Sequence, residues 1–334
     1  MDPQIPKVNV VVLAYNHEQF IRQALDGILA QDVDFAYEVV VGEDCSTDHT
    51  RRIVQAYARR HPAIFRPVYH SSNVGVGANL RACVAACRGQ YIALLDGDDY
   101  WTSPLKLRKQ VAWLDGHPDY SLCFHAVMNH YEDGFLPDRV SQHYTKDVYT
   151  FEDFLASNSL LASTCSVLLR RSVLPVWPAW LFTVVNIDYP LVLLYADLGK
   201  VKLLPEVMGT YRIHRGGIFS GTPQLLNIER FVPVGEQLWR HFAPTHRAAQ
   251  VQRKLYNLYL GMANAYANAG RPADAIGFIK KAVRLGAGPQ HKSLPGLLKT
   301  GLRVVRGLAR LNRPPAGMAP YRHVPVIPAV RPGA

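Results

Sequence analysis

Apolar, strand-like runs alternate with helical periodicity over the first hundred residues, and this alternation limits the possible folds more than any other feature. Residues 8–14 (VNVVVLA) are apolar almost throughout, as expected of a strand buried on both faces. Further strands are predicted at 37–42, 65–69 and 91–95, and helices at about 18–30, 46–58 and 78–86. Strand–helix–strand repeats at this spacing predict right-handed crossovers. We therefore expect an α/β fold in which helices flank a Rossmann-type, mainly parallel sheet.

The pattern changes after about residue 104 and again after about residue 221. Helices are predicted at 105–114 and 190–198, and strand-like segments at 121–128, 164–169 and 207–213. Beyond residue 221 strand signals nearly vanish, and the remainder is typical of helices followed by a proline-rich tail. One tetratricopeptide-like helical hairpin is indicated there by Ala263, Tyr266, Gly270, Ala275 and Ala282. We expect an α/β domain over residues 1–220 and a helical C-terminal region over residues 221–334.

Positive charge is concentrated near the C-terminal end. The net charge is +11, yet the sequence as far as His246 holds 22 Lys and Arg against 25 Asp and Glu, and the remainder holds 15 against the single Asp274. From Lys299 to Arg313 basic residues recur at intervals of 4, 3, 4 and 3 beside an apolar face. The segment from Leu297 to Arg313 is therefore expected to form a basic amphipathic helix, which either contacts an anionic membrane surface or packs on the protein. A nucleic-acid partner is not expected, because no recognition fold accompanies the charge.

Cysteine usage favours a cytoplasmic protein. The five cysteines are an odd number and include no C-x-x-C pair, which argues for reduced thiols and against a disulfide framework or a zinc site. The first residues lack the basic start and long apolar run of a secretory signal, and no run approaches the roughly 18 apolar residues of a membrane-spanning helix. We expect a cytoplasmic location, peripheral on the inner face of the membrane if the basic segment binds lipid.

Polar residues follow the ends of three predicted strands: Tyr15 after the first, Glu43 and Asp44 after the second, and Asp96, Asp98 and Asp99 after the fourth. The carboxyl ends of parallel strands meet at one edge of a sheet, where such folds bind ligands. Taken singly, each residue has an ordinary alternative as a packing ring, a helix cap or an acidic turn. Clustered carboxylates repel one another unless a cation joins them. The set therefore predicts a divalent metal, Mg²⁺ or Mn²⁺, both of which prefer oxygen ligands.

Several sequence blocks, taken with their spacing, resemble those of the family 2 glycosyltransferases. From Val8 to about Gly217 these blocks are VVVLAYN, GEDCSTDHT, NVGVGANLRACVAACRGQYIALLDGDDYW, PLKLRKQV and NIDYPLVLLYADLGKVKLLPEVMGTYRIHRGG. The resemblance implies a GT-A fold, a nucleotide-sugar donor, a divalent metal and sugar transfer with inversion. It favours a UDP-sugar, with uracil, thymine and guanine all open as the base. It also implies a carbohydrate or lipid-linked acceptor, in bacterial-type surface polysaccharide or glycoconjugate synthesis.

Carried over residue by residue, the resemblance implies contacts to the donor and the metal. Tyr15 would stack on the base, and Asp44 would hydrogen-bond it with Glu43 beside it. Asp98 would ligate the metal. Asp96 would contact the ribose, or the metal and its water shell.

The resemblance also implies roles for five residues elsewhere in the chain. Asp188 falls where such enzymes keep the catalytic base, although an acid at a helix start is also favoured by the helix dipole. Arg212 would contact the diphosphate, and His214 the metal, unless this histidine is simply structural. Many relatives carry Ala-Arg-Asn after the third strand, whereas the nearest residues here are Asn79-Leu80-Arg81. Donor contacts are accordingly carried over to Asn79 and Arg81.

Two other functions compete with a transferase. A sugar nucleotidyltransferase would show a Gly-rich phosphate loop after the first strand, where this chain has Ala14-Tyr15-Asn16-His17. His17 itself is expected only to begin the following helix. A non-catalytic sugar-nucleotide-binding or scaffold protein could use the same fold. A dehydrogenase is rejected, because the stretch from Gly75 lacks the third glycine of the dinucleotide fingerprint and follows the third strand.

Overall fold

The computed structural model describes residues 5–132, 134, 136–142, 144–157 and 160–286. The chain forms two compact units, Met1–Leu255 and Tyr256–Ala334. The boundary that we expected after residue 220 lies inside the first unit. Among the described residues, no helix has the length and apolar character needed to span a membrane.

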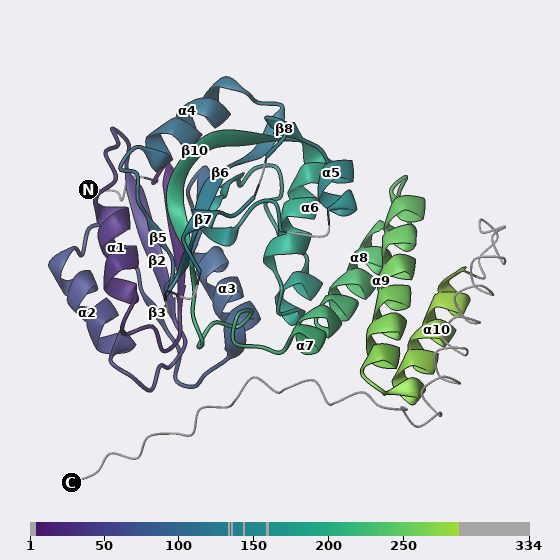
Figure 1. Cartoon of the computed structure of the whole chain (residues 1–334). Coiled ribbons are helices and arrows are strands. Elements are labelled where there is room, and N and C mark those ends of the chain that lie inside the picture. The colour runs from purple at the N-terminus through teal and green to yellow at the C-terminus, as the bar shows by residue number, and fades with distance from the viewer. Residues whose placement is uncertain (1–4, 133, 135, 143, 158–159, 287–334) are drawn as a thin grey trace, which may run out of the picture. The chain divides into compact units, whose positions relative to one another are not determined.

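One sheet lies at the centre of the first unit (Figure 1). Within the described chain its strands are β1 (Val8–Ala14), β2 (Tyr37–Glu43), β3 (Val68–Tyr69), β4 (Tyr91–Asp96), β5 (Tyr100–Trp101), β6 (Tyr120–Tyr131), β7 (Arg139–Val140), β8 (Val148–Tyr149), β9 (Leu168–Arg170) and β10 (Lys200–Ile213). The main order is β3-β2-β1-β4-β9-β6-β10-β5, with β7 beside β6 and β8 beside β10. The three long ladders, β1 with β2, β1 with β4 and β6 with β10, are parallel. The antiparallel pairings of β5, β7, β8 and β9 cover only two or three residues each.

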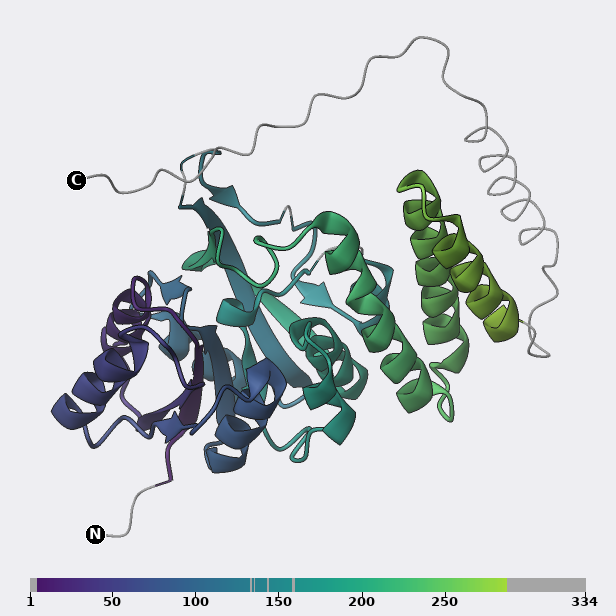
Figure 2. The same cartoon turned by 90° about the horizontal axis from the view of Figure 1, so that it is seen from below.

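Helices cover both faces of the sheet (Figures 1 and 2). One hydrophobic core contains residues of α1 (Ile21–Leu29), α2 (Thr50–Arg60) and α4 (Lys106–Gly116). The other contains residues of α3 (Gly75–Ala86), α5 (Phe151–Ala156), α6 (Asp188–Leu198) and α8 (Phe231–Phe242), and α7 (Gln224–Glu229) precedes α8. Because side chains alternate along a strand, Val10 and Val12 of β1 enter the first core and Val11 enters the second. The predicted α/β fold is confirmed.

Three segments differ from the strands that the sequence suggested. The strand expected at 65–69 is reduced to Val68–Tyr69 and an isolated bridge between Phe65 and Val39, because Pro67 has no N–H with which to extend the ladder. The strand expected at 164–169 starts as a 3₁₀ turn, Thr164–Ser166, and only Leu168–Arg170 is extended. Strand β10 begins at Lys200 rather than residue 207, and register shifts beside Pro205 interrupt its ladder with β6.

The second unit begins within helix α9 (Ala248–Asn268) and continues through α10 (Pro272–Gly286). A turn joins the two helices, and Gly270 adopts φ 70° in it, a conformation that glycine tolerates best. Tyr266 stacks on Phe278 with ring centroids 5.6 Å apart. These helices occupy the positions of the expected hairpin. The basic segment from Leu297 to Arg313 lies outside the described residues, so its contact with an anionic membrane surface stays a prediction from the sequence.

Lys106, the first residue of α4, is a fully buried amine. Its Nζ atom lies 3.9 Å from the centroid of the Trp101 ring. The same atom has no hydrogen-bond partner among the residues that the structure describes. Burial lowers the pKa of Lys106 to about 7. Folding therefore weakens proton binding at this amine, which costs stability.

Replacing Lys106 by Met is expected to raise the free energy of unfolding at pH 7 by about 1–3 kcal/mol, because an apolar chain of similar length replaces an unpaired amine. Between about pH 7 and pH 10 the unfolded wild type binds more protons at this lysine than the folded form, so its stability should rise with pH. Urea unfolding at pH 7 and pH 9 measures both effects. A variant less stable than wild type at pH 7, or one with the same pH dependence, would contradict this account.

Candidate functional site

The carboxyl ends of three parallel strands meet at one edge of the sheet. Ala14 of β1 pairs with Glu43 of β2, and Leu13 of β1 pairs with Asp96 of β4. This register brings the polar residues that follow these strands to a common edge, as the sequence suggested: Tyr15, Glu43, Asp44, Asp96 and Asp98.

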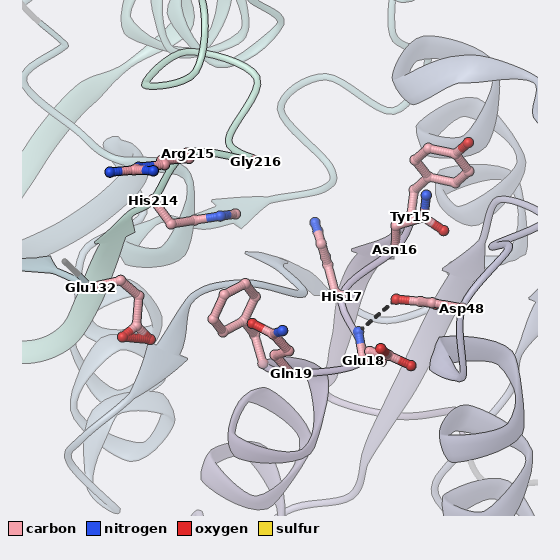
Figure 3. Close-up of a pocket in the computed structure, with 11 residues that line it drawn as sticks. Tyr15, Asn16, His17, Glu18, Gln19, Asp48, Glu132, His214, Arg215 and Gly216 are labelled. Carbon is pink, nitrogen blue, oxygen red and sulfur yellow. Dashed lines mark hydrogen bonds between the residues drawn. The ribbon is translucent and has the colours of Figure 1, made fainter. Parts of the chain in front are cut away.

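Hydrogen bonds join the loop after β1 to the loop after β2. Asn16 has φ 56° and accepts the N–H of Thr47 on its Oδ1 atom at 2.8 Å. Glu18 donates its N–H to the Asp48 carboxylate at 3.0 Å (Figure 3). His17 lies between these two anchored residues, so its backbone position is fixed from both sides.

Asp98 lies between two imidazoles. His214 Nε2 is hydrogen-bonded to Asp98 Oδ2 at 3.1 Å, and His17 Nε2 lies 3.7 Å from the same oxygen. Burial opposes ionisation of Asp98, but the hydrogen bond with His214 and the charges of the two histidines outweigh it, so the pKa of Asp98 lies below its ordinary value. The carboxylate form, which a metal ligand requires, is therefore favoured.

His17 is a candidate functional residue that our sequence reasoning missed. Burial lowers its pKa, against the opposing influence of Asp98. Its Nδ1 atom is buried and has no hydrogen-bond partner among the described residues. The sequence signal that could have identified His17 was its position three residues after the end of β1, at the edge where ligands bind in such sheets.

Asp96 and Asp188 form a second acidic pair next to Asp98. Burial and the charges of Asp98 and Asp188 raise the pKa of Asp96 to about 8. Asp188 is the first residue of α6, and its Oδ1 atom accepts the N–H of Tyr189 at 2.8 Å. Burial also raises the pKa of Asp188. The fold thus brings Asp188 near Asp96 of β4, from which it is about ninety positions distant in the sequence.

A cavity of 820 Å³ opens beside His17 and His214, the two histidines that face Asp98 (Figure 3). Both positive and negative groups line it, together with two aromatic rings. The lining residues are Tyr15, Asn16, His17, Glu18, Gln19, Phe20, Asp48, Glu132, His214, Arg215 and Gly216. Of the residues singled out from the sequence, Tyr15 and His214 are in this lining, and Tyr15 is 41% exposed.

Glu43 and Asp44 are both buried and bonded to the protein. Glu43 accepts the N–H of Ser46 at 2.7 Å and forms an ion pair with Arg51. The Asp44 carboxylate accepts the N–H groups of Val74 and Gly75 at 2.7 and 2.9 Å. Asp44 therefore caps the start of α3 from another part of the chain, and so holds the loop in front of α3 against the sheet edge.

Asn79 and Arg81 lie differently on α3. Asn79 is buried, donates to the Gly42 carbonyl at 2.9 Å and lies 3.1 Å from His70 Nε2 through its Oδ1 atom. Arg81 is exposed, and its side chain has no hydrogen-bond or ion-pair partner among the described residues. The structure therefore joins Asn79 to the strand β2 and does not bring Arg81 to the cavity lining.

The two arginines near His214 also differ. Arg212 is only 6% exposed, is not among the cavity-lining residues, and donates to protein acceptors. Arg215 is exposed, lines the cavity, and has no side-chain hydrogen-bond or ion-pair partner in the described part of the chain. Arg215 is thus the arginine that is open to an anionic ligand.

The described part of the chain does not by itself form a complete metal cage. The described residues contain no group of three or more His, Cys, Asp or Glu side chains that could hold a metal ion. Asp98 and His214 nevertheless supply an ionised oxygen and an imidazole nitrogen 3.1 Å apart. This pair fits a metal that takes its other ligands from a bound substrate and water, as Mg²⁺ commonly does in phosphate sites.

Comparison with known proteins adds sequence relatives and structural neighbours. Residues 9–176 match the model of the family described as glycosyl transferase family 2. An uncharacterized protein of Mycobacterium tuberculosis is 42% identical over 212 residues. The match covers 64% of this chain and 60% of that relative.

Two solved structures share the fold. The Staphylococcus aureus TarS 1–349 structure in complex with UDP-GlcNAc has a TM-score of 0.64 at 21% identity, covering 90% of this chain and 89% of that one. The mannosyltransferase PcManGT from Pyrobaculum calidifontis, in complex with GDP-Man and Mn²⁺, has a TM-score of 0.52 at 20% identity, covering 91% and 82%. Since the family model covers half of its residues, the chain belongs to glycosyl transferase family 2.

Proposed function

We propose that the chain is a metal-dependent, inverting glycosyltransferase that moves a sugar from a nucleotide-diphosphate sugar to an acceptor hydroxyl. The observation that carries the proposal is the Asp98–His214 pair, 3.1 Å apart, beside a cavity of 820 Å³. A cavity of this size suits a small-molecule ligand. The acceptor is proposed to be a carbohydrate or a lipid-linked molecule of surface polysaccharide or glycoconjugate synthesis.

The donor is proposed to lie along the edge formed by β1, β2 and β4. The half-exposed ring of Tyr15 is available for stacking on a base, and Asp44 would accept a ring N–H in addition to its two backbone donors. Arg215 is the proposed diphosphate contact, because it lines the cavity with its guanidinium unpaired. A UDP-sugar is favoured by the UDP-GlcNAc bound to TarS, and the GDP-Man complex makes GDP-sugars the first comparison.

Asp98 and His214 are proposed to hold Mn²⁺ or Mg²⁺, with Asp96 beside them contacting the ribose or the water shell of the metal. A bound metal would offset the charge that develops on the leaving diphosphate. The protein's own contribution is to keep Asp98 ionised and to direct its Oδ2 atom toward His214.

Asp188 is the proposed general base. Burial raises its pKa, which makes its carboxylate a stronger proton acceptor. It would take the proton of the acceptor hydroxyl while that oxygen forms a bond to the anomeric carbon. The bond from that carbon to the diphosphate oxygen breaks on the opposite face, so the configuration inverts.

A thermal-shift screen tests the donor class and the metal requirement together. At about 100 times its Kd, a UDP-sugar is expected to raise the melting temperature by roughly 5 °C in the presence of Mn²⁺, because ligand binding stabilises the folded state. EDTA should remove most of this shift, and GDP- and dTDP-sugars should produce smaller ones. The absence of a shift with every nucleotide sugar would contradict the proposed function. Tight binding without hydrolysis or transfer would instead favour a non-catalytic sugar-nucleotide-binding protein.

A further inference from the structure

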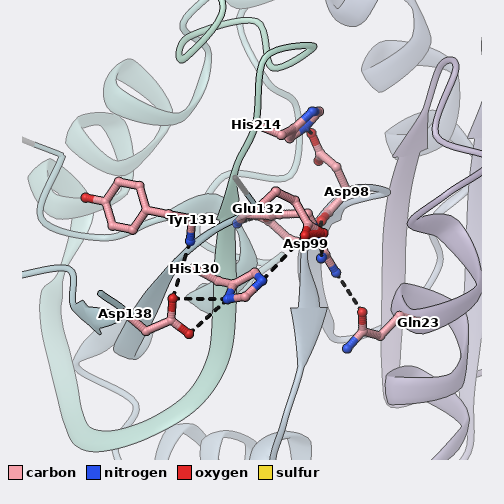
Figure 4. Close-up of polar contacts among 9 residues, drawn as sticks. Gln23, Asp98, Asp99, His130, Tyr131, Glu132, Asp138 and His214 are labelled. Carbon is pink, nitrogen blue, oxygen red and sulfur yellow. Dashed lines mark hydrogen bonds and ion pairs between the residues drawn. The ribbon is translucent and has the colours of Figure 1, made fainter. Parts of the chain in front are cut away.

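Arg212 donates hydrogen bonds to three separate parts of the chain, at Asp98, Glu132 and Gln23. Figure 4 labels these three partners. Its Nε atom donates to the Asp98 carbonyl at 2.7 Å, and one terminal nitrogen donates to Gln23 Oε1 at 2.7 Å. The other terminal nitrogen forms an ion pair with Glu132. In addition, the backbone N–H of Arg212 donates to Asp99 Oδ1 at 2.8 Å. These contacts connect β10 to the turn after β4, to helix α1 and to the residue that follows β6.

Aromatic rings further restrict this guanidinium. Its central carbon lies 4.7 Å from the centroid of Phe20 and 4.9 Å from that of Tyr100. Cation–π contacts at these distances add to the hydrogen bonds, and the side chain is 6% exposed. The hydrogen bonds and the ring contacts therefore fix both the orientation of the Arg212 guanidinium and its buried position in the protein.

The position of Arg212 couples the two proposed metal ligands. His214 follows it by two residues in the chain, whereas Asp98 is 116 positions away from His214 and contacts it only through the fold. One arginine thus holds the backbone of Asp98 by its side chain and belongs to the strand that presents His214. A shift of this side chain would change the separation between the Asp98 carboxylate and the His214 imidazole.

Electrostatics argue against a direct diphosphate contact. Glu132 pairs with the guanidinium and lines the cavity, whereas Arg212 does not, so an incoming phosphate would meet a carboxylate that is already paired with Arg212. A diphosphate oxygen would have to displace this carboxylate. Arg215 presents an unpaired guanidinium to the same cavity and meets no such competitor in the described residues.

We propose that Arg212 is a positioning residue that sets Asp98 and His214 at the separation needed for a metal-bound donor, without touching the donor itself. This inference rests on the proposed function. It predicts that Arg212 matters for nucleotide binding only when the metal takes part, whereas a direct phosphate contact would matter with or without the metal.

Calorimetric titration of UDP in Mn²⁺ and in EDTA separates these roles. Lysine keeps the charge at position 212 but cannot reach three acceptors at once. Arg212→Lys is therefore expected to weaken UDP binding at least tenfold in Mn²⁺ and to leave the affinity in EDTA within about twofold of wild type. Arg215→Gln serves as the comparison variant, and it should weaken UDP binding under both conditions. An Arg212→Lys protein that loses affinity equally in EDTA, or loses none in Mn²⁺, would overturn the positioning role.

Gln23→Leu provides a milder variant if Arg212→Lys fails to fold. Gln23 is exposed on α1 and is not among the cavity-lining residues, yet it accepts a hydrogen bond from Arg212. We expect a loss of about threefold in Mn²⁺-dependent UDP affinity and no change in EDTA, and an unchanged affinity in Mn²⁺ would count against the proposal. If the wild type binds UDP equally with and without Mn²⁺, the proposed function and this inference both fail. If wild-type UDP binding depends on Mn²⁺ but neither substitution changes the UDP affinity, the proposed function stands and the positioning role fails.

Discussion

Asp188→Asn is expected to lower kcat by about 10²–10⁴-fold while leaving the affinity for the nucleotide sugar within about twofold of wild type. The reason is that asparagine preserves the shape of the side chain but cannot accept a proton, and a positioned general base contributes a rate factor of about this size. Initial rates of UDP release measured in the presence of an acceptor give kcat. Calorimetry of UDP-sugar binding gives the affinity.

Asp34→Asn is a suitable control. Asp34 is exposed, and its substitution also removes one carboxylate, but at a position far from the sheet edge. The competing explanation for Asp188 is stabilisation of α6 through the helix dipole, because it is the acidic residue of the first turn. In that case the variant would lose up to about 1 kcal/mol of stability and keep its turnover. A collapse of donor affinity with preserved kcat would also show that the catalytic role is wrongly assigned.

The regular part of the fold could be predicted because local patterns determine it. The run from Val8 to Ala14 shows the continuous apolar character of a strand covered on both faces, and its side chains do alternate between two cores. Strand β5 was not predicted, and β9 was predicted only as part of a longer strand at 164–169, the start of which is a 3₁₀ turn. They are two and three residues long, and each is extended only because a distant strand pairs with it. Pairing between distant residues has no local signature in a single sequence.

The distinction between local patterns and contacts between distant residues applies to the site as well. The gathering of Tyr15, Asp44 and Asp98 at one edge follows from strand order alone, so the sequence was sufficient for it. The environment of Arg212 was not accessible in this way, because Glu132, which follows β6, and Gln23 of α1 reach it only through packing. A basic residue near a proposed metal ligand can either bind a phosphate or hold neighbouring segments of the protein in place. Only its tertiary partners distinguish these two roles.

Asp98→Asn is expected to abolish the Mn²⁺ dependence of UDP binding and to lower turnover by at least about 10³-fold. Asp98 Oδ2 is the oxygen that faces the Nε2 atoms of both His214 and His17, and its lowered pKa keeps it charged. An amide is neutral and a much weaker ligand for a hard divalent cation, so the charge on the leaving diphosphate would no longer be offset. Titration of Mn²⁺ into the UDP complex, followed by calorimetry or by the electron paramagnetic resonance of free Mn²⁺, measures the loss directly.

Asp138→Asn is the matched control for this experiment, because Asp138 also pairs with a histidine at 2.9 Å, but this partner, His130, does not line the cavity, whereas His17 and His214 do. It should leave the affinity for Mn²⁺ and the rate of transfer unchanged. Undiminished Mn²⁺ affinity in Asp98→Asn would remove Asp98 as a ligand. Asp188→Asn and Asp98→Asn are expected to fail in opposite ways. Asp188→Asn should bind the donor and not turn it over, whereas Asp98→Asn should lose metal-dependent binding first. If both variants lost binding and rate together, the sheet edge would be acting as one structural unit, and separate roles for base and ligand could not be maintained.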